Sequence, residues 1–121
     1  MKLQWKVISL AVAATLSVHA STQAQVSGDV VKIGFITDLS GVYSDIDGKG
    51  GAEAIRMAIA DFGGNVLGKK IELVTADHQN KADIAASKAR EWFDREGVDM
   101  LIGGTNSGAA LSMAKVSAEK K

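Results

Sequence analysis

The chain has 121 residues, and its 14 basic and 14 acidic side chains give a formal net charge of zero. This balance provides no extended basic field of the kind that nucleic-acid-binding domains present to phosphates. There is no cysteine, which excludes disulfides, thiol nucleophiles and thiolate metal sites. With 46% hydrophobic and 23% charged residues, the composition is typical of one globular domain rather than of a disordered chain.

Residues 1–24 have the pattern of a cleavable secretory signal peptide. Two lysines precede the apolar segment 7–18, which is too short to cross a bilayer as a helix. Small residues favour cleavage after Ala24 or, alternatively, after Ala20. We therefore expect an exported protein, periplasmic in a Gram-negative host, whose mature domain spans residues 25–121.

The mature chain alternates between two kinds of hydrophobic pattern. Continuous β-branched and apolar runs predict strands, whereas apolar residues spaced three or four apart predict helices. The expected elements in chain order are a strand over 30–37, a helix over 51–63, a strand over 70–76, a helix over 82–96, a strand over 98–102 and a helix from 109 onward. This β-α-β-α-β-α order predicts an α/β fold with a parallel three-stranded sheet and right-handed crossovers.

Apolar stripes on two of these helices predict part of the core. In the second helix the stripe consists of Ala85, Ala89, Trp92 and Phe93. In the first helix it consists of Ile55, Ala58, Ile59 and Phe62. Asn80 is expected to cap the second helix, with Asp83 in its first turn.

The stretch 100–108 carries the strongest indication of a binding site. An apolar strand end runs through two glycines into Thr105, Asn106 and Ser107, just before the third helix. The first turn of a helix has N–H groups without partners and a partial positive charge, which suits a carboxylate or a phosphate. Asn106 and Ser107 could add hydrogen bonds to such an anion, or one of them could simply cap the helix.

Topology points to a second contributor to this site. In open α/β sheets, ligands bind at the carboxyl ends of strands where the strand order reverses. The loops 38–50 and 103–108 leave such ends, so we expect them to meet. The site hypothesis therefore combines the two loops.

Other chemistries find little support. Residues 48–53 begin like a dinucleotide fingerprint but place Glu53 where a glycine is required. Gly103 and Gly108 have the spacing of a phosphate loop, but Ala109 and Ala110 follow where lysine and serine or threonine are required. Four aspartates lack the spacing of a calcium loop and are expected to be solvated turn residues, namely Asp38, Asp45, Asp47 and Asp77. His78, the single histidine outside residues 1–24, is predicted to be a surface or hinge residue. No catalytic set, metal site or cofactor is predicted.

Several short motifs occur together in a fixed order. They are VKIG at 31–34, LSG at 39–41, GAEA at 51–54, GKKIEL at 68–73, GVD at 97–99, IGG at 102–104 and NS at 106–107. The set resembles the N-terminal lobe of periplasmic solute-binding proteins of the branched-chain amino acid (Leu/Ile/Val) type, which serve ATP-driven importers. The resemblance implies part of a type I, Rossmann-like lobe that closes with a second lobe on a small ligand, without catalysis.

The resemblance also implies which residues contact the ligand. In similar proteins the ligand carboxylate meets hydroxyl and N–H groups at the position of Ser107, and the loop after the first strand lies nearby. The implied ligand-binding residues are Ser107, Asn106, Thr105, Ser40, Gly41 and Tyr43. Tyr43 could equally pack on its own loop. The motif SGVYSD at 40–45 looks like a subgroup whose ligands include aromatic and other small carboxylates.

The expected function is the substrate-binding component of an ABC importer, which captures an amino acid or a similar small carboxylate and delivers it to a membrane permease. Members of the resembled family are much longer, so the chain is expected to be a partial lobe. Two alternatives stay open: an extracellular ligand-sensing module of the same fold, and a non-functional gene fragment.

Overall fold

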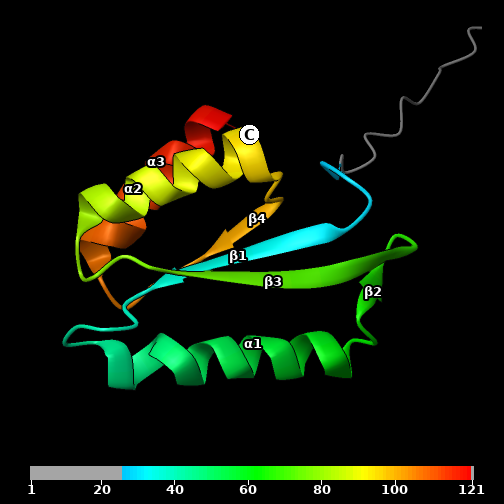
Figure 1. Cartoon of the computed structure of the whole chain (residues 1–121), viewed down its shortest axis with the longest axis horizontal. Coiled ribbons are helices and arrows are strands. Elements are labelled where there is room, and N and C mark those ends of the chain that lie inside the picture. Colours follow the sequence, from blue (N-terminus) through cyan, green and yellow to red (C-terminus); the bar gives the residue numbers. More distant parts are fainter. Residues whose placement is uncertain (1–25, 121) are drawn as a thin grey trace, which may run out of the picture.

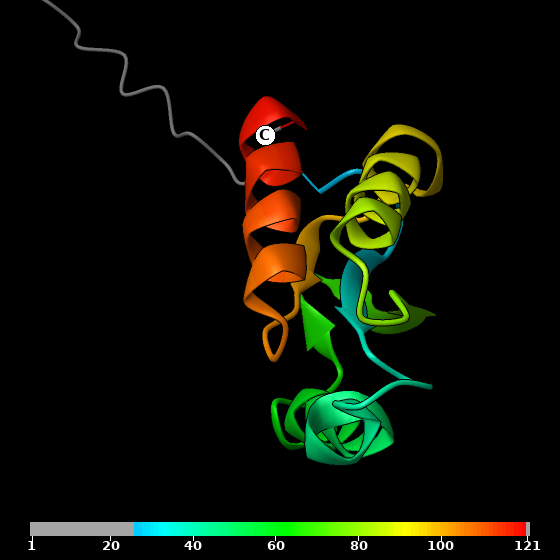
Figure 2. The ribbon, with the colours of Figure 1, turned by 90° about the vertical axis from the view of Figure 1, so that its left-hand side faces the viewer.

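The computed structural model describes residues 26–120, so the predicted signal peptide lies outside the described residues. A sheet lies between two layers of helices (Figure 1). Helix α1 (Lys49–Asp61) covers one face, and helices α2 (Ala82–Glu91) and α3 (Ser107–Lys120) cover the other. Figure 2 shows α2 and α3 side by side, with α1 on the far side of the strands.

The sheet has four strands in the order β2-β3-β1-β4. They are β1 (Val31–Thr37), β2 (Asn65–Val66), β3 (Lys69–Asp77) and β4 (Met100–Ile102). Strand β1 is parallel to both β3 and β4, which confirms the predicted parallel three-stranded unit. The sequence did not predict β2, an antiparallel partner of β3, because two residues are too short to carry a periodic pattern.

The helices follow the predicted order with shifted boundaries. Helix α2 continues into a π-helical turn, η2 (Trp92–Glu96), and together they span the predicted helix 82–96. A second π-helical turn, η1 (Ser44–Gly48), lies within the predicted loop 38–50 and leads directly into α1. Within residues 26–120, none of the helices is long and apolar enough to cross a membrane.

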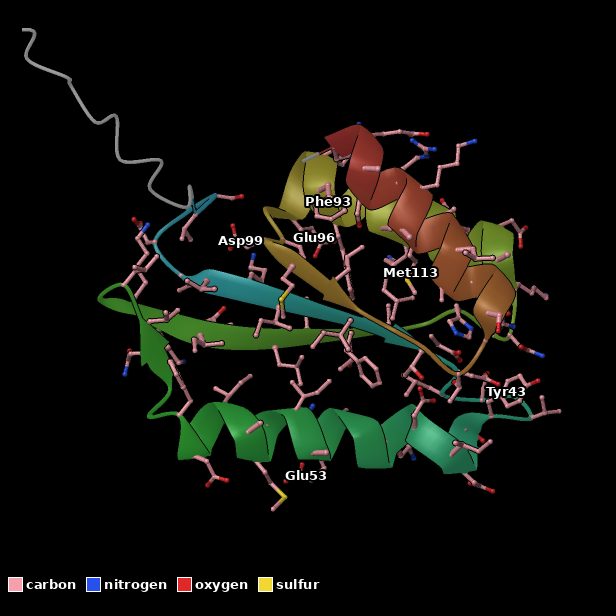
Figure 3. The ribbon with its side chains drawn as sticks, turned by 180° about the vertical axis from the view of Figure 1, so that it is seen from behind. Tyr43, Glu53, Phe93, Glu96, Asp99 and Met113 are labelled. Atoms are coloured by element: carbon pink, nitrogen blue, oxygen red, sulfur yellow. The ribbon has the colours of Figure 1, made fainter. Side chains whose placement is uncertain are left out.

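The core lies between the sheet and the α2–α3 layer. Its buried members are Ile36, Ala85, Ala89, Trp92, Val98, Ala109, Met113 and Val116. Met113 extends from α3 toward the sheet (Figure 3). The predicted stripe on α2 is confirmed, because Phe93 also packs against this cluster.

Gly34 makes room for the largest side chain of this core. A Cβ atom at Gly34 would lie 2.6 Å from Cε3 and Cζ3 of Trp92 and 3.0 Å from a methyl carbon of Leu101. Distances below about 3 Å between carbon atoms are strongly repulsive. The glycine on the middle strand therefore lets the indole ring lie directly against the backbone.

The opposite face of the sheet is less well covered. Only Ala52 of α1 is buried. Ala58 and the 67% exposed Phe62 lie at the surface, so their expected place in the core is wrong, whereas Ile55 and Ile59 are half-buried. An apolar groove of about 340 Å³ remains between α1 and the strands. It is lined by Ile33, Ile55, Ala58, Ile59, Phe62, Ile71 and Ile102. The stripe faces the sheet as expected, and the groove leaves part of it uncovered.

Candidate functional site

The carboxyl ends of β1 and β4 are neighbours, and the chain leaves them toward opposite faces of the sheet. From β1 it runs through η1 into α1, whereas from β4 it runs into α3 on the other face (Figures 1 and 2). This is the reversal of strand order expected from the sequence, the usual place for a ligand crevice in an open α/β sheet. The structure therefore brings the two predicted loops to the same end of the molecule.

Asp38 organises the loop after β1. Its side chain is fully buried, with Oδ1 accepting a hydrogen bond from the Gly41 N–H at 2.7 Å and Oδ2 accepting one from the Tyr43 N–H at 3.0 Å. The prediction of a solvated turn residue is thus wrong for Asp38. A buried carboxylate needs such donors, and the two backbone N–H groups provide them.

Asp77, at the end of β3, fixes the same loop from the neighbouring strand. Its carboxylate accepts hydrogen bonds from the Leu39 N–H at 3.0 Å, the Ser40 hydroxyl at 2.6 Å and the Gln79 N–H at 2.8 Å. The hydroxyl proton of Ser40, a predicted ligand-binding residue, is therefore directed to Asp77. Ser40 itself remains exposed at the surface.

Asp47 joins the two loops of the site. Its Oδ1 accepts hydrogen bonds from the hydroxyls of Thr37 and Thr105, each at 2.8 Å.

Of the four aspartates predicted to be solvated, only Asp45 is exposed. Within residues 26–120, no group of three acidic or histidine side chains could hold a metal ion.

Asn106 caps helix α3. Its Oδ1 accepts a hydrogen bond from the Ala109 N–H at 2.8 Å, while its Nδ2 donates to the side-chain oxygen of Asn80 and to the Asn80 carbonyl. The capping alternative is therefore confirmed for Asn106. Ser107 is the first residue of α3 and is exposed. Ligand contacts by either residue stay a prediction.

The structure corrects two predictions about the loop after β3. The surface alternative for His78 is wrong, because the residue is only 1% exposed and its Nδ1 accepts a hydrogen bond from the Asn80 N–H at 2.9 Å; the hinge alternative stays a prediction. Lys81, not Asn80, occupies the N-cap position of α2 and makes no side-chain cap. Asn80 has a left-handed φ of 57° and binds Asn106 instead. The sequence could not reveal this, because the partner is distant along the chain.

Tyr43 is half-buried at the end of the molecule where the loop before α3 also lies (Figure 3). Its carbonyl accepts a hydrogen bond from the Ile46 N–H at 3.0 Å, which begins η1. The backbone of Tyr43 is thus part of its own loop. Both alternatives for the ring, packing on that loop or contacting a ligand, stay open.

A structural role was not predicted from the sequence for the three aspartates whose hydrogen bonds hold the loops of the site. Asp38 and Asp77 each occur where a strand ends, and Asp47 lies next to Gly48 just before a helix. Aspartate at such junctions commonly accepts hydrogen bonds from nearby backbone N–H groups. That pattern was available in the sequence and would have indicated structural carboxylates.

The pKa of Asp77 predicts an acid-sensitive contribution to stability. Partial burial raises the pKa, but hydrogen bonds from Ser40, Leu39 and Gln79 and the nearby His78 outweigh burial and hold it below its ordinary value of 3.8. A lowered pKa in the folded state stabilises the protein above the ordinary pKa, and this stabilisation is lost as the pH falls through the folded-state value. When the pH is lowered from 7 to 3, the free energy of unfolding should therefore fall less in Asp77→Asn than in the wild type. Urea denaturation at the two pH values measures this difference.

The Ser40→Ala variant provides the matching test, since it removes the hydroxyl that contributes most to lowering this pKa. It should also reduce the difference in stability between the two pH values. If both variants keep the full wild-type difference, Asp77 does not contribute to the acid sensitivity.

Comparisons with known proteins place this geometry in a family. Residues 30–121 match the family model described as periplasmic binding protein. A periplasmic binding protein from Burkholderia mallei is 75% identical and has a TM-score of 0.74, over 76% of this chain and 24% of that chain. No match was found among curated proteins.

Two further solved structures are similar. A branched chain amino acid ABC transporter periplasmic ligand-binding protein from Burkholderia xenovorans LB400 is 49% identical, with a TM-score of 0.71 over 74% of this chain and 24% of that chain. An ABC transporter solute binding protein from R. palustris, in complex with benzoate, is 27% identical, with a TM-score of 0.67 over 74% of this chain and 25% of that chain.

The chain spans about a quarter of the length of these solved chains. Its fold corresponds to a part of their type I lobes. The chain therefore belongs to the periplasmic binding protein family, and its solved relatives include a protein named for branched chain amino acid ABC transport.

Proposed function

We propose that this chain provides the ligand-contacting part of the first lobe of an ABC-importer solute-binding protein, which captures a small carboxylate in the periplasm. The observation that carries the proposal is the meeting of the β1 and β4 loops beside the first turn of α3. Asn106 caps the Ala109 N–H, so the N–H groups of Ser107 and Gly108 are the donors left in the first turn of α3, where the helix dipole adds a partial positive charge.

The chemistry of the relatives supports a carboxylate as the ligand. The R. palustris protein is in complex with benzoate, and the Burkholderia xenovorans protein is named for branched-chain amino acids. Both kinds of ligand carry a carboxylate, whereas their remaining groups differ. We assign ligand contacts to Ser107, Asn106, Thr105, Ser40, Gly41 and Tyr43, with the carboxylate at Ser107. Thr105 and Asn106 contribute backbone N–H groups, because their side-chain donors already have partners.

The rest of the proposal concerns the route of the ligand. Residues 1–24 act as a cleavable signal peptide, residues 25–121 form the lobe region, and a membrane permease receives the ligand. The chain itself catalyses no reaction and needs no cofactor.

The binding free energy of a carboxylate held only by N–H groups, a hydroxyl and the helix terminus is about 3–5 kcal/mol in favour of binding, which corresponds to roughly millimolar affinity.

Titration of the full chain with sodium benzoate tests the proposal, with amide chemical shifts measured by two-dimensional NMR. Shifts should concentrate at residues 40–43 and 103–108 and saturate in about the millimolar range. Leucine, titrated separately, tests the amino-acid class. Benzamide is the matched neutral control and should cause much smaller shifts, because it lacks the charge attracted by the helix terminus.

Ser107→Ala should weaken benzoate binding about tenfold, the factor expected for one hydrogen bond to a charged group. The exposed Ser87 on α2 supplies the control, since Ser87→Ala should leave the affinity unchanged. Shifts spread evenly over the surface, or equal responses to benzoate and benzamide, would contradict an anion site at α3.

A further inference from the structure

We propose that Asp47 is a positioning residue that holds residues 103–106, the segment before α3, in the conformation that presents the first turn of α3 to an anion. This inference deepens the proposed function, on which its ligand-binding part rests. A carboxylate on the β1 side of the site thus controls the conformation of a loop on the β4 side.

The contacts of Asp47 span the reversal point of the sheet. A single oxygen, Oδ1, accepts the hydroxyl of Thr37 from the end of β1 and the hydroxyl of Thr105 from residues 103–106, both at 2.8 Å. Thr37 is fully buried, so one end of this link is part of the rigid sheet. Hydrogen bonds to an ionised acceptor are about twice as strong as those between neutral groups.

The position of Asp47 is itself constrained by its neighbour Gly48. A Cβ atom at Gly48 would lie 2.8 Å from the carbonyl oxygen of Asp38, so any larger residue would push η1 away from β1. Gly48 is buried, and η1 leads without interruption into α1. Asp47 therefore reaches Thr105 from a backbone that lies tightly against the sheet.

The segment 103–106 packs closely only at its first residue and depends on side-chain anchors beyond it. A Cβ atom at Gly103 would lie 2.9 Å from the carbonyl oxygen of Ile36, whereas one at Gly104 would have no atom within 4 Å. Thr105 anchors the segment to Asp47, and Asn106 anchors it to Asn80 and to the first turn of α3. Of these anchors, only Asp47 joins the segment to the β1 side.

This arrangement separates the roles of the predicted ligand-binding residues. The proton of the Thr105 hydroxyl is used in the hydrogen bond to Asp47, so Thr105 has no hydroxyl donor left for a carboxylate. Donation to the anion falls to backbone N–H groups and to the exposed Ser107. Thr105 thus contributes by fixing where those donors lie.

Amide hydrogen exchange and chemical shifts of the ligand-free full chain test the positioning role. Asp47→Ala should shift the amides of residues 103–107 and raise their exchange rates about tenfold, the factor expected for losing one hydrogen bond to a charged group. Asp47→Asn should largely restore both properties, because the amide oxygen still accepts two hydrogen bonds. The exposed Asp45 in the same turn is the control, and Asp45→Ala should leave residues 103–107 unchanged.

Thr105→Val is the second variant and remains informative if Asp47→Ala does not fold. It removes only the hydroxyl and should reproduce the shifts and the faster exchange in 103–107. Sodium benzoate affinity, titrated by NMR, should fall about tenfold in Asp47→Ala and Thr105→Val but little in Asp47→Asn.

The two proposals fail in different ways. Unchanged exchange and shifts at 103–107 in Thr105→Val and in folded Asp47→Ala would overturn the positioning role, whatever the ligand result. Changed exchange in these variants, together with no benzoate binding by the wild type, would support the positioning role and contradict the proposed function.

Discussion

Replacing Trp92 by alanine should lower the free energy of unfolding of the full chain by about 3–5 kcal/mol. The indole ring is 3% exposed and lies against the backbone of β1 at Gly34, with Leu101 alongside. Removing it leaves a cavity that the α2–α3 layer cannot fill without moving two helices. Urea denaturation followed by circular dichroism measures the loss, because the midpoint should move to lower urea at a similar slope.

Phe62 offers a matched aromatic control on the opposite side of the sheet. It is 67% exposed, so Phe62→Ala should change the free energy of unfolding by no more than about 0.5 kcal/mol. Equal losses for the two variants would contradict the conclusion that the core lies between the sheet and the α2–α3 layer.

Replacing Asp38 by asparagine should cost about 2–3 kcal/mol, although the two side chains have almost the same shape. One carboxylate oxygen becomes an NH₂ group, so either the Gly41 N–H or the Tyr43 N–H then faces a donor instead of an acceptor. The remaining hydrogen bond also loses its charge. The loss should appear in urea denaturation, together with faster amide exchange at residues 39–43.

Asp45→Asn is the control for this substitution, since Asp45 is an exposed carboxylate a few residues away. It should change the stability by less than about 0.5 kcal/mol. A neutral result for Asp38→Asn, with wild-type exchange at 39–43, would show that the buried carboxylate does not organise the loop.

The order of the elements was predictable because the strands and the first two helices have clear hydrophobic patterns. The strand 30–37 is a continuous apolar run, and the second helix has a stripe centred on Ala89 and Trp92, both of which are buried. Boundaries were less accurate because they depend on caps and turns. Helix α3 begins at Ser107 rather than at 109, since Asn106 forms its cap.

The place of the site was also predictable, but its internal bonding was not. Strand order alone brings the loops after β1 and β4 together. In contrast, the link from Asp47 to Thr105 joins residues far apart in sequence, and no local pattern reveals it. His78 shows the same limit, because its burial results from packing between segments rather than from its neighbours in the chain.

The unequal covering of the two sheet faces has a consequence for motion. Helix α1 keeps only Ala52 buried and borders an apolar groove, so little packing is lost when it detaches briefly from the strands. Regions with few buried contacts open locally without unfolding the rest of a domain. Since α1 continues directly from η1, an opening that spreads into η1 also withdraws Asp47 from Thr105. Gly48 keeps η1 close to the loop after β1 and thereby limits how often an opening of α1 reaches the segment before α3.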